Sequence, residues 1–342
     1  MPAKWIRVAA TAAFAYLPVQ AVAADAALVE AAKKEGQVTW YTTFIVNQVT
    51  RPMVEAFEKK YGIKVNYVRN DAQDIVVRVE NEIKAGQLQA DIFDGTGSSP
   101  YFKRKGLLAK YLPDSTKNYP KEYLDPDGYW AGVSLYLQTF GYNTSVIKKG
   151  SEPKSLDDLL DPKWKGQMGL SASSSSPGVG GFVGYVLSKK GEAGGIDYLK
   201  KLRQQNVAIV PGSARQVLDQ VIAGEYPIGL QILSHHVVFS ANRGAPVAWT
   251  PIEDAMAVLL TVSIFKDAPH PAAGRLLMDF LFADEGQNVL RDAEYIPASP
   301  SVQPKDPSLR PDGKTFRARV FTPEELDANT EKWMKIYDQT LR

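Results

Sequence analysis

The chain has 342 residues, no cysteine, three histidines and 44% hydrophobic residues, with 40 lysines and arginines against 38 aspartates and glutamates. Without cysteine there is no disulfide framework, so the stability of the protein has to come from a hydrophobic core, for which the length is sufficient. A formal net charge of +2 is too small for the strongly basic surface that binds nucleic acid or an anionic membrane.

The N-terminus has the pattern of a secretory signal. Lys4 and Arg7 precede an alanine-rich apolar stretch that ends at Ala21-Val22-Ala23, so we predict a cleaved signal peptide over residues 1–23. Its removal takes the formal net charge from +2 to zero. No later stretch approaches the roughly 20 apolar residues of a membrane span. The mature chain is therefore predicted to be exported, and its length fits about two domains of roughly 150 residues.

Strands and helices alternate through the first part of the mature chain. The expected order is a helix ending at Gly36, a strand over 37–44, a helix over 51–62, a strand over 63–68, a helix over 74–86 and a strand over 90–97. This alternation predicts a mostly parallel sheet covered on both faces. Because ligands of such sheets lie at the carboxyl ends of the strands, the loops at Thr42-Thr43 and at 95–99 are candidate binding segments.

A second α/β region follows. Residues 129–147 and 247–265 each predict a long extended segment that crosses between domains. Between them we expect a short helix and a strand within 152–171, a helix and a strand within 194–210, and a helix over 213–223. Residues 270–292 predict one amphipathic helix, and 324–341 predict a helix that packs back on the protein.

The serine run "SASSSSPGVGG" over 171–181 follows a predicted strand and precedes a helix that opens near Gly180. Hydroxyls and free N–H groups at a helix start favour an anion, although a flexible loop capped by serine is the alternative. The glycine spacing GxGxxxG misses the dinucleotide-binding pattern by one residue, so no cofactor is expected.

The segment "GSARQVLDQVIAG" over 212–224 contains a capping box, with Ser213 at the N-cap and Gln216 three residues later. Arg215 lies in the first helical turn, where a cation is poorly placed for the helix dipole. It is either there to meet an anionic ligand or it forms an ion pair with a nearby carboxylate.

Two of the three histidines, His235 and His236, are adjacent. Neighbours in a strand point to opposite faces, so both can reach one metal only if the chain has left the strand at Ser234. His270 is flanked by prolines and is expected in an exposed turn. No His-x-x-x-His spacing, Gly-x-Ser-x-Gly elbow or phosphate-binding loop is present, so the sequence gives no support for an enzyme.

Several stretches together resemble the periplasmic solute-binding proteins of ABC importers, in the branch that includes ferric-iron and phosphonate binders. The most specific are "SLDDLLDPKWKG" and the "GSARQ" helix; "LVEAAKKEGQVTWYTTF", "GEYPIGL" and "DFLFADEGQNVL" are more general. The resemblance implies a type II periplasmic binding fold, in which two α/β domains enclose a central ligand cleft and are joined by two crossing hinge strands. It places 24–130 and about 248–292 in domain I, and 131–247 and about 293–342 in domain II. It also implies an inner-membrane ABC importer permease as partner, a small-molecule ligand, a monomer and no cofactor.

The chain departs from the ferric pattern of that branch. Where ferric binders present two adjacent tyrosines, this sequence has Ser234-His235-His236, and the crossing strand has Tyr136 and Gln138 where those relatives tend to have arginine. Phenolates suit Fe(III) better than neutral imidazole does. The favoured ligand is therefore a small anionic solute, such as a phosphonate, organophosphate or carboxylate. The expected ligand-binding residues are Thr42, Thr43, Thr96, Ser98, Ser173, Ser174, Ser175, Ser176, Gly178, Arg215, His235, His236 and Tyr136.

Three alternatives remain open. A ferric or metal-chelate binder would use His235 or His236 with Tyr41 or Tyr136. An organic-cation binder would use Asp91 or Asp94 with the aromatic residues. An exported metal-dependent hydrolase would need a set of ligands and a nucleophile that the sequence does not indicate.

Overall fold

The computed structural model describes residues 25–342 except 175–177, 253, 312 and 315. The predicted signal over 1–23 and two of the predicted ligand-binding serines, Ser175 and Ser176, therefore lie outside the described residues. Within them, no helix is long and apolar enough to cross a membrane.

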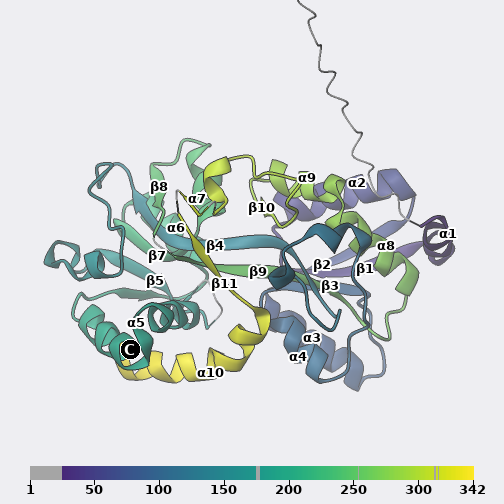
Figure 1. Ribbon diagram of the computed structural model, residues 1–342, viewed down its shortest axis with the longest axis horizontal. Coiled ribbons are helices and arrows are strands. Elements are labelled where there is room, and N and C mark those ends of the chain that lie inside the picture. Colours follow the sequence, from purple (N-terminus) through teal and green to yellow (C-terminus); the bar gives the residue numbers. More distant parts are fainter. Residues whose placement is uncertain (1–24, 175–177, 253, 312, 315) are drawn as a thin grey trace, which may run out of the picture.

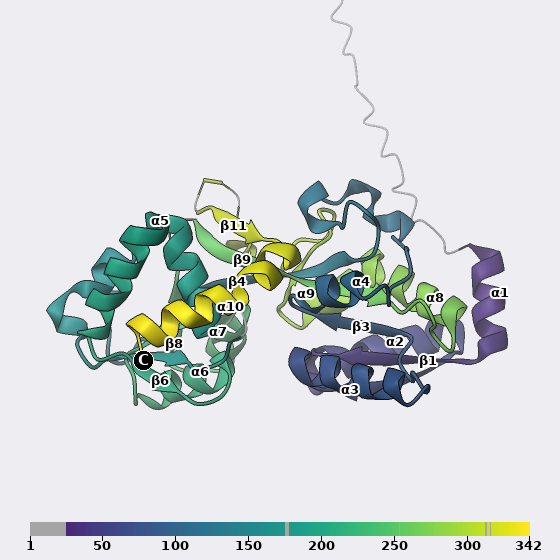
Figure 2. The ribbon, with the colours of Figure 1, turned by 90° about the horizontal axis from the view of Figure 1, so that it is seen from below.

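The chain folds into two α/β lobes on one continuous sheet, with strand order β2-β1-β3-β9-β4-β7-β5-β6. Figure 1 shows β4 and β9 running through the middle of the molecule, and Figure 2 shows the lobes on either side of them. This is the predicted arrangement of two domains and two crossing strands.

The first lobe is built on parallel strands β1–β3, with α1, α2, α3, α4, α8 and α9 around them (Figure 1). Its strands are β1 (Gln37–Thr42), β2 (Lys64–Arg69) and β3 (Ile92–Gly95). Its helices are α1 (Ala26–Glu35), α2 (Arg51–Tyr61), α3 (Ala72–Lys84), α4 (Ser98–Arg104), α8 (Pro271–Phe282) and α9 (Asp284–Asp292), with short helical turns at Val46–Thr50, Asp114–Asn118 and Lys121–Tyr123. Trp40, Phe44, Phe57 and Phe280 are fully buried in its core.

The second lobe is built on β5–β7, which are also parallel, and is covered by α5, α6, α7 and α10. Its strands are β5 (Met168–Ser171), β6 (Ala208–Val210), β7 (Ile228–Leu233) and β8 (Val247–Thr250). Its helices are α5 (Val179–Arg203), α6 (Ala214–Ala223), α7 (Ser234–Ala241) and α10 (Pro323–Thr340), with short helical turns at Asp157–Leu160 and Pro162–Trp164. The C-terminal helix α10 packs on α5, as predicted, through Trp333 and its neighbours in the core of this lobe.

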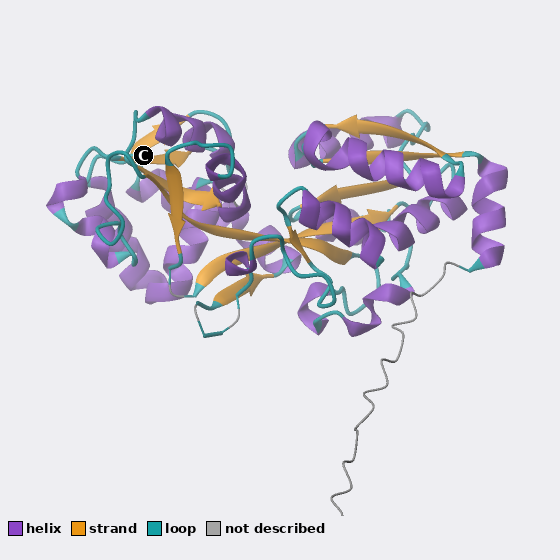
Figure 3. Cartoon of the chain, turned by 90° about the horizontal axis from the view of Figure 1, so that it is seen from above, coloured by secondary structure: helices purple, strands orange, loops and turns teal. Residues whose placement is uncertain are grey.

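The hinge consists of β4 (Ala131–Asn143) and β9 (Ala255–Ile264), which pair antiparallel from Ala131 to Gln138. One end of β9 pairs with β3 and the far part of β4 pairs with β7, so each strand belongs to both lobes. Both strands are almost entirely buried. The short strands β10 (Ile296–Pro297) and β11 (Ala318–Phe321) extend the sheet at β4 and β9, and one further helical turn spans Pro307–Leu309. In Figure 3 the chain crosses between the lobes only in this central region.

Two of the predicted elements are wrong in detail. The amphipathic stretch 270–292 is not one helix, because Ala283 is extended (ψ 158°) and α9 starts afresh with Asp284 and Glu285 in its first turn, where acids favour a helix start. Residues 247–265 form two strands. Only β9 crosses between the lobes, whereas β8 pairs with the second-lobe end of β4.

His270 is not an exposed turn residue. It precedes α8, and its Nδ1 lies 3.0 Å from Oδ2 of Asp91, whose side chain is fully buried. The backbone N–H of Thr39 donates to the same oxygen at 2.7 Å. This cluster joins the amino-terminal end of β3 to α8 and lies away from the carboxyl ends of the strands.

Candidate functional site

Each lobe contributes the carboxyl ends of three parallel strands as candidate binding segments. In the first lobe β1, β2 and β3 end at Thr42, Arg69 and Gly95; in the second lobe β5, β6 and β7 lead to the starts of α5, α6 and α7. Ligands of open α/β sheets bind at such ends. Ring contacts that include Tyr136 of β4 lie between the two sets.

Asp94 organises the first-lobe side. Its carboxylate is fully buried at the end of β3 and accepts hydrogen bonds from the Thr43 backbone N–H (2.8 Å), the Thr43 hydroxyl (2.6 Å) and Nε1 of Trp40 (2.8 Å). Burial raises the pKa of this carboxyl to about 6, although the hydrogen bonds lower it. Asp94 therefore holds the loop after β1 in place and keeps its own oxygens engaged within the protein.

A cluster of aromatic rings forms the centre of the site. His235 lies between Tyr295, at a ring-centroid distance of 4.4 Å, and Tyr136, at 5.1 Å, with His236 at 4.5 Å. Tyr295 also contacts Phe44 of the first lobe at 5.6 Å. Since Tyr136 belongs to the hinge strand β4 and the histidines belong to α7, the cluster links both lobes to the hinge.

The chain does leave the strand at Ser234, where α7 begins, so both histidines are buried rather than one facing solvent. Both ring nitrogens of His235 lack a hydrogen-bond partner among the described residues. Burial lowers the pKa of His235 well below its ordinary value and lowers that of His236 to about 3, where the charge of Arg215 also contributes. Both imidazoles are therefore neutral near pH 7.

An arginine from each lobe acts on this cluster through its charge. Burial raises the pKa of Tyr136 and Tyr295, and the charge of Arg69, the last residue of β2, opposes that shift. Burial lowers the pKa of His236 and the charge of Arg215 on α6 lowers it further, while Arg215 also donates a hydrogen bond to Ser240 of α7 at 3.1 Å. Arg215 forms the ion pair that the sequence left open, with Asp219 at 2.8 Å, and Arg69 pairs with Asp71 at 3.0 Å. The side chains of Asp219 and Asp71 are 54% and 71% exposed, so water screens both ion pairs. An anionic ligand can therefore replace either aspartate at small cost.

The serine-glycine segment approaches α5 closely. A Cβ on Gly178 would lie 2.3 Å from the carbonyl oxygen of Ser173, and one on Gly180 would lie 2.4 Å from that of Ser174. These glycines are thus required by a loop that folds back over the helix start, which accounts for their spacing without a cofactor. Ser173 is half-buried and Ser174 is exposed, both at the carboxyl end of β5.

The remaining predicted residues lie in the first lobe at strand ends. Thr42 is buried, and its hydroxyl accepts from the backbone N–H of Phe44 at 3.1 Å. Thr96 is half-buried in the loop after β3. The Ser98 hydroxyl is buried at the start of α4 without a hydrogen-bond partner among the described residues.

The alternative ligand sets are less well supported by geometry. The Tyr41 hydroxyl donates to Glu82 of α3 at 2.5 Å, and its ring packs in a hydrophobic cluster that does not include His235. Asp91 binds His270. Among the described residues, no group of three or more histidines, cysteines, aspartates and glutamates is arranged to hold a metal ion.

Arg69 and Tyr295 were not predicted from the sequence. Arg69 directly follows the strand predicted over 63–68 and ends the observed β2, so the rule that pointed to the ends of β1 and β3 could have found it as well. Tyr295 follows α9 in a stretch with no binding pattern, and only the fold brings it to the histidines.

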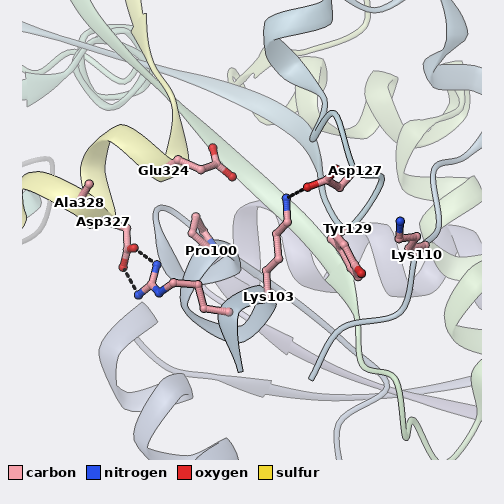
Figure 4. Close-up of a pocket in the computed structure, with 9 residues that line it drawn as sticks. Pro100, Lys103, Lys110, Asp127, Tyr129, Glu324, Asp327 and Ala328 are labelled. Atoms are coloured by element: carbon pink, nitrogen blue, oxygen red, sulfur yellow. Dashed lines mark hydrogen bonds and ion pairs between the residues drawn. The ribbon is translucent and has the colours of Figure 1, made fainter. Parts of the chain in front are cut away.

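Figure 4 shows a separate cavity of about 650 Å³ beside the hinge, where α4 and the loop before β4 face the first turns of α10. The Arg104 guanidinium pairs with Asp327, and Nε1 of Trp130 donates to Glu324 at 2.9 Å, so both contacts reach from the first lobe to α10. Lys103 bridges Asp125 and Asp127, each at 2.7 Å. Most of the charges that line this cavity are thus already paired.

The Arg104–Asp327 pair is expected to contribute little to stability. Asp327→Asn should lower the free energy of unfolding by less than about 1 kcal/mol, because the Arg104 side chain is 59% exposed and surface pairs of this kind are weak. Urea denaturation of the wild type and the variant measures the difference. A loss above about 2 kcal/mol would show that the Arg104–Asp327 pair stabilises the contact between the first lobe and α10 more than the exposure of Arg104 indicates.

Residues 89–319 match the family of bacterial extracellular solute-binding proteins, and the chain belongs to that family. Its relatives include a protein of Salmonella typhimurium named putative 2-aminoethylphosphonate-binding periplasmic protein, which is 25% identical over 80% of this chain and 78% of the relative. The Fe(3+)-binding periplasmic protein of Serratia marcescens is 24% identical over 71% of this chain and 73% of the relative.

Solved structures of similar fold include iron-bound HitA from Pseudomonas aeruginosa, with a TM-score of 0.75 and 22% identity over 89% of this chain and 99% of the other. The periplasmic binding protein AfuA from Actinobacillus pleuropneumoniae with bound fructose-6-phosphate has a TM-score of 0.74 and 22% identity over 90% and 98%. At such identities the likeness establishes the fold, which is the type II periplasmic binding fold predicted from the sequence.

Proposed function

We propose that this solute-binding protein captures a small organic anion, bearing a phosphonate, phosphate or carboxylate group, between its lobes in the periplasm. It then delivers that solute to the inner-membrane permease of an ABC importer. It acts as a monomer without catalysis. Its two domains follow the predicted division, 24–130 with about 248–292 and 131–247 with about 293–342, except that residues 294 and 295 belong with the first lobe, where Tyr295 packs in the core. The names of the relatives, which include phosphonate-binding and periplasmic proteins, support this proposal.

The observation that carries the proposal is a pair of arginines on opposite lobes, each at the carboxyl end of a parallel strand. Arg69 ends β2, and Arg215, in the first turn of the helix that follows β6, donates to Ser240 of the histidine-bearing helix α7 at 3.1 Å. The neighbouring carboxylate, Asp94, already accepts three hydrogen bonds within the protein. Guanidinium groups bind phosphonate and carboxylate oxygens in pairs. An anion that contacts both arginines bridges the lobes and shifts the population toward the closed form.

The metal-chelate and cation alternatives are weaker on the same grounds. Fe(III) would have to displace the protons of Tyr136 and Tyr295, whose pKa burial raises, and the neighbouring imidazoles are neutral, softer ligands. A cation would need a free carboxylate, whereas the oxygens of Asp94 are hydrogen-bonded and fully buried.

The test is calorimetric titration of the refolded, ligand-free protein with 2-aminoethylphosphonate, fructose-6-phosphate, citrate, inorganic phosphate and Fe(III) with carbonate. Arg69→Ala and Arg215→Ala should each weaken binding of the preferred anion by about 10- to 100-fold, since a hydrogen bond to a charged group contributes roughly 1.5–3 kcal/mol.

Arg291→Ala is the matched control. Arg291 is 38% exposed and pairs with Asp292 at 2.8 Å, much as Arg69 is 42% exposed and pairs with Asp71 at 3.0 Å, but it lies on α9. The control should bind as the wild type does. Binding of Fe(III) alone, or anion binding that neither arginine affects, would refute the proposal.

A further inference from the structure

Glu294 has a backbone conformation that its residue type does not favour. It follows α9 with φ +67° and is 5% exposed, and it caps the helix: its N–H donates to Arg291 O, and that of Tyr295 donates to Leu290 O, both at 2.9 Å. Glycine is the usual residue at such a left-handed cap, because a Cβ is strained there. The cap itself requires no side chain, so the buried carboxylate calls for a separate explanation.

The side chain of Glu294 reaches the other lobe. Oε2 accepts a hydrogen bond from Nδ2 of Asn242 at 2.7 Å, and Asn242 ends α7. Oε1 lies 3.5 Å from Nζ of Lys305 and 3.9 Å from Arg243, whose side chains are 57% and 56% exposed. The short hydrogen bond from Asn242 to the buried Glu294 carboxylate is therefore the specific contact, while the longer pairs with exposed lysine and arginine are weak.

The next residue holds the opposite end of α7. The Tyr295 ring lies 4.4 Å from that of His235 in the first turn of the helix. Burial raises the pKa of its hydroxyl, and the backbone of Ile45, in the loop that Asp94 fixes, opposes that shift. An eight-residue helix is about 12 Å long. Residues 294 and 295 thus hold both ends of α7 from the first lobe.

Helix α7 in turn places the polar groups of the candidate site. His235 and His236 lie at its start, and Oγ of Ser240 accepts a hydrogen bond from Arg215 at 3.1 Å. A shift of α7 would move the histidines and the Arg215 guanidinium together.

We propose that Glu294 is a positioning residue of the binding site: through Asn242 it fixes the pose of α7 and hence of His235, His236 and Arg215. This inference rests on the proposed function for its effect on affinity, whereas its effect on the histidines does not depend on any ligand.

The test uses Glu294→Gly, which removes the side chain and the backbone strain together. With three histidines in the chain, their imidazole signals can be followed by NMR. We expect the His235 and His236 signals to shift while that of His270, at the far end of the first lobe, does not. Affinity for 2-aminoethylphosphonate should fall about 3- to 10-fold with no loss of thermal stability.

Three variants separate positioning from capping. Glu294→Gln keeps an acceptor for Asn242 and should restore the wild-type signals, Asn242→Ala should reproduce the shifts of Glu294→Gly, and Lys305→Ala should have no effect. If Glu294→Gly leaves the His235 and His236 signals unchanged, the carboxylate does not position α7 and the inference is wrong. Shifted histidine signals without any anion binding would instead overturn the proposed function and leave the positioning role intact.

Discussion

Replacing Asp94 with alanine is expected to lower the free energy of unfolding by about 3–4 kcal/mol. The change removes a fully buried acceptor and leaves the Thr43 N–H, the Thr43 hydroxyl and Trp40 Nε1 without their partner. Each buried donor left unpaired costs about 1–3 kcal/mol, partly offset because the carboxylate itself is unfavourable in a buried site. Chemical denaturation near pH 7 measures the loss.

Asp94→Asn provides the graded control for that experiment. Its amide oxygen can still accept both hydrogen bonds from Thr43, but its NH₂ group would face Nε1 of Trp40, so we expect a loss of about 1–2 kcal/mol. If the alanine variant is no less stable than the asparagine variant, the hydrogen bonds to Thr43 do not hold the loop after β1.

The elements that position the site could be predicted because each follows from a local pattern. Gly36 and Gly224 end α1 and α6 in the left-handed conformation, and Ser213 and Gln216 form the predicted capping box. Strand alternation then identified the ends of β1 and β3 as candidate binding segments. These features depend on residues within a few positions of each other, so the sequence alone is sufficient for them.

The centre of the site could not be predicted in the same way, because its contacts join distant parts of the chain. Tyr136, His235 and Tyr295 lie on β4, on α7 and after α9, and no spacing relates them. The placement of His235 and His236 depended on where β7 ends: a strand three residues longer, through His236, would have placed them on opposite faces. The break at Ala283 was missed for a similar reason, since the apolar periodicity runs through both α8 and α9.

The pH dependence of stability provides the second large effect. Burial lowers the pKa of His236 from 6.5 to about 3, so the unfolded chain binds a proton more tightly than the folded protein does. Stability is therefore present above the unfolded pKa and is lost as the pH falls. Between pH 7 and about pH 4.5, His236 should cost roughly 2–3 kcal/mol. His235, whose pKa is also lowered by burial, acts in the same direction.

Asp94 acts in the opposite direction over the same range. Its pKa is raised from 3.8 to about 6, so the folded protein binds the proton more tightly and gains roughly 2 kcal/mol between pH 7 and about pH 4.5. The two contributions separate in single variants. Relative to the wild type, His236→Gln should become more stable by roughly 2–3 kcal/mol on acidification, and Asp94→Asn should become less stable by roughly 2 kcal/mol. Denaturation of the three proteins at both pH values measures these differences. Parallel pH profiles for wild type and His236→Gln would mean that the pKa of His236 is the same in the folded and unfolded protein. In that case burial does not keep this imidazole neutral, and it would gain its charge at the site as the pH falls through 6.5.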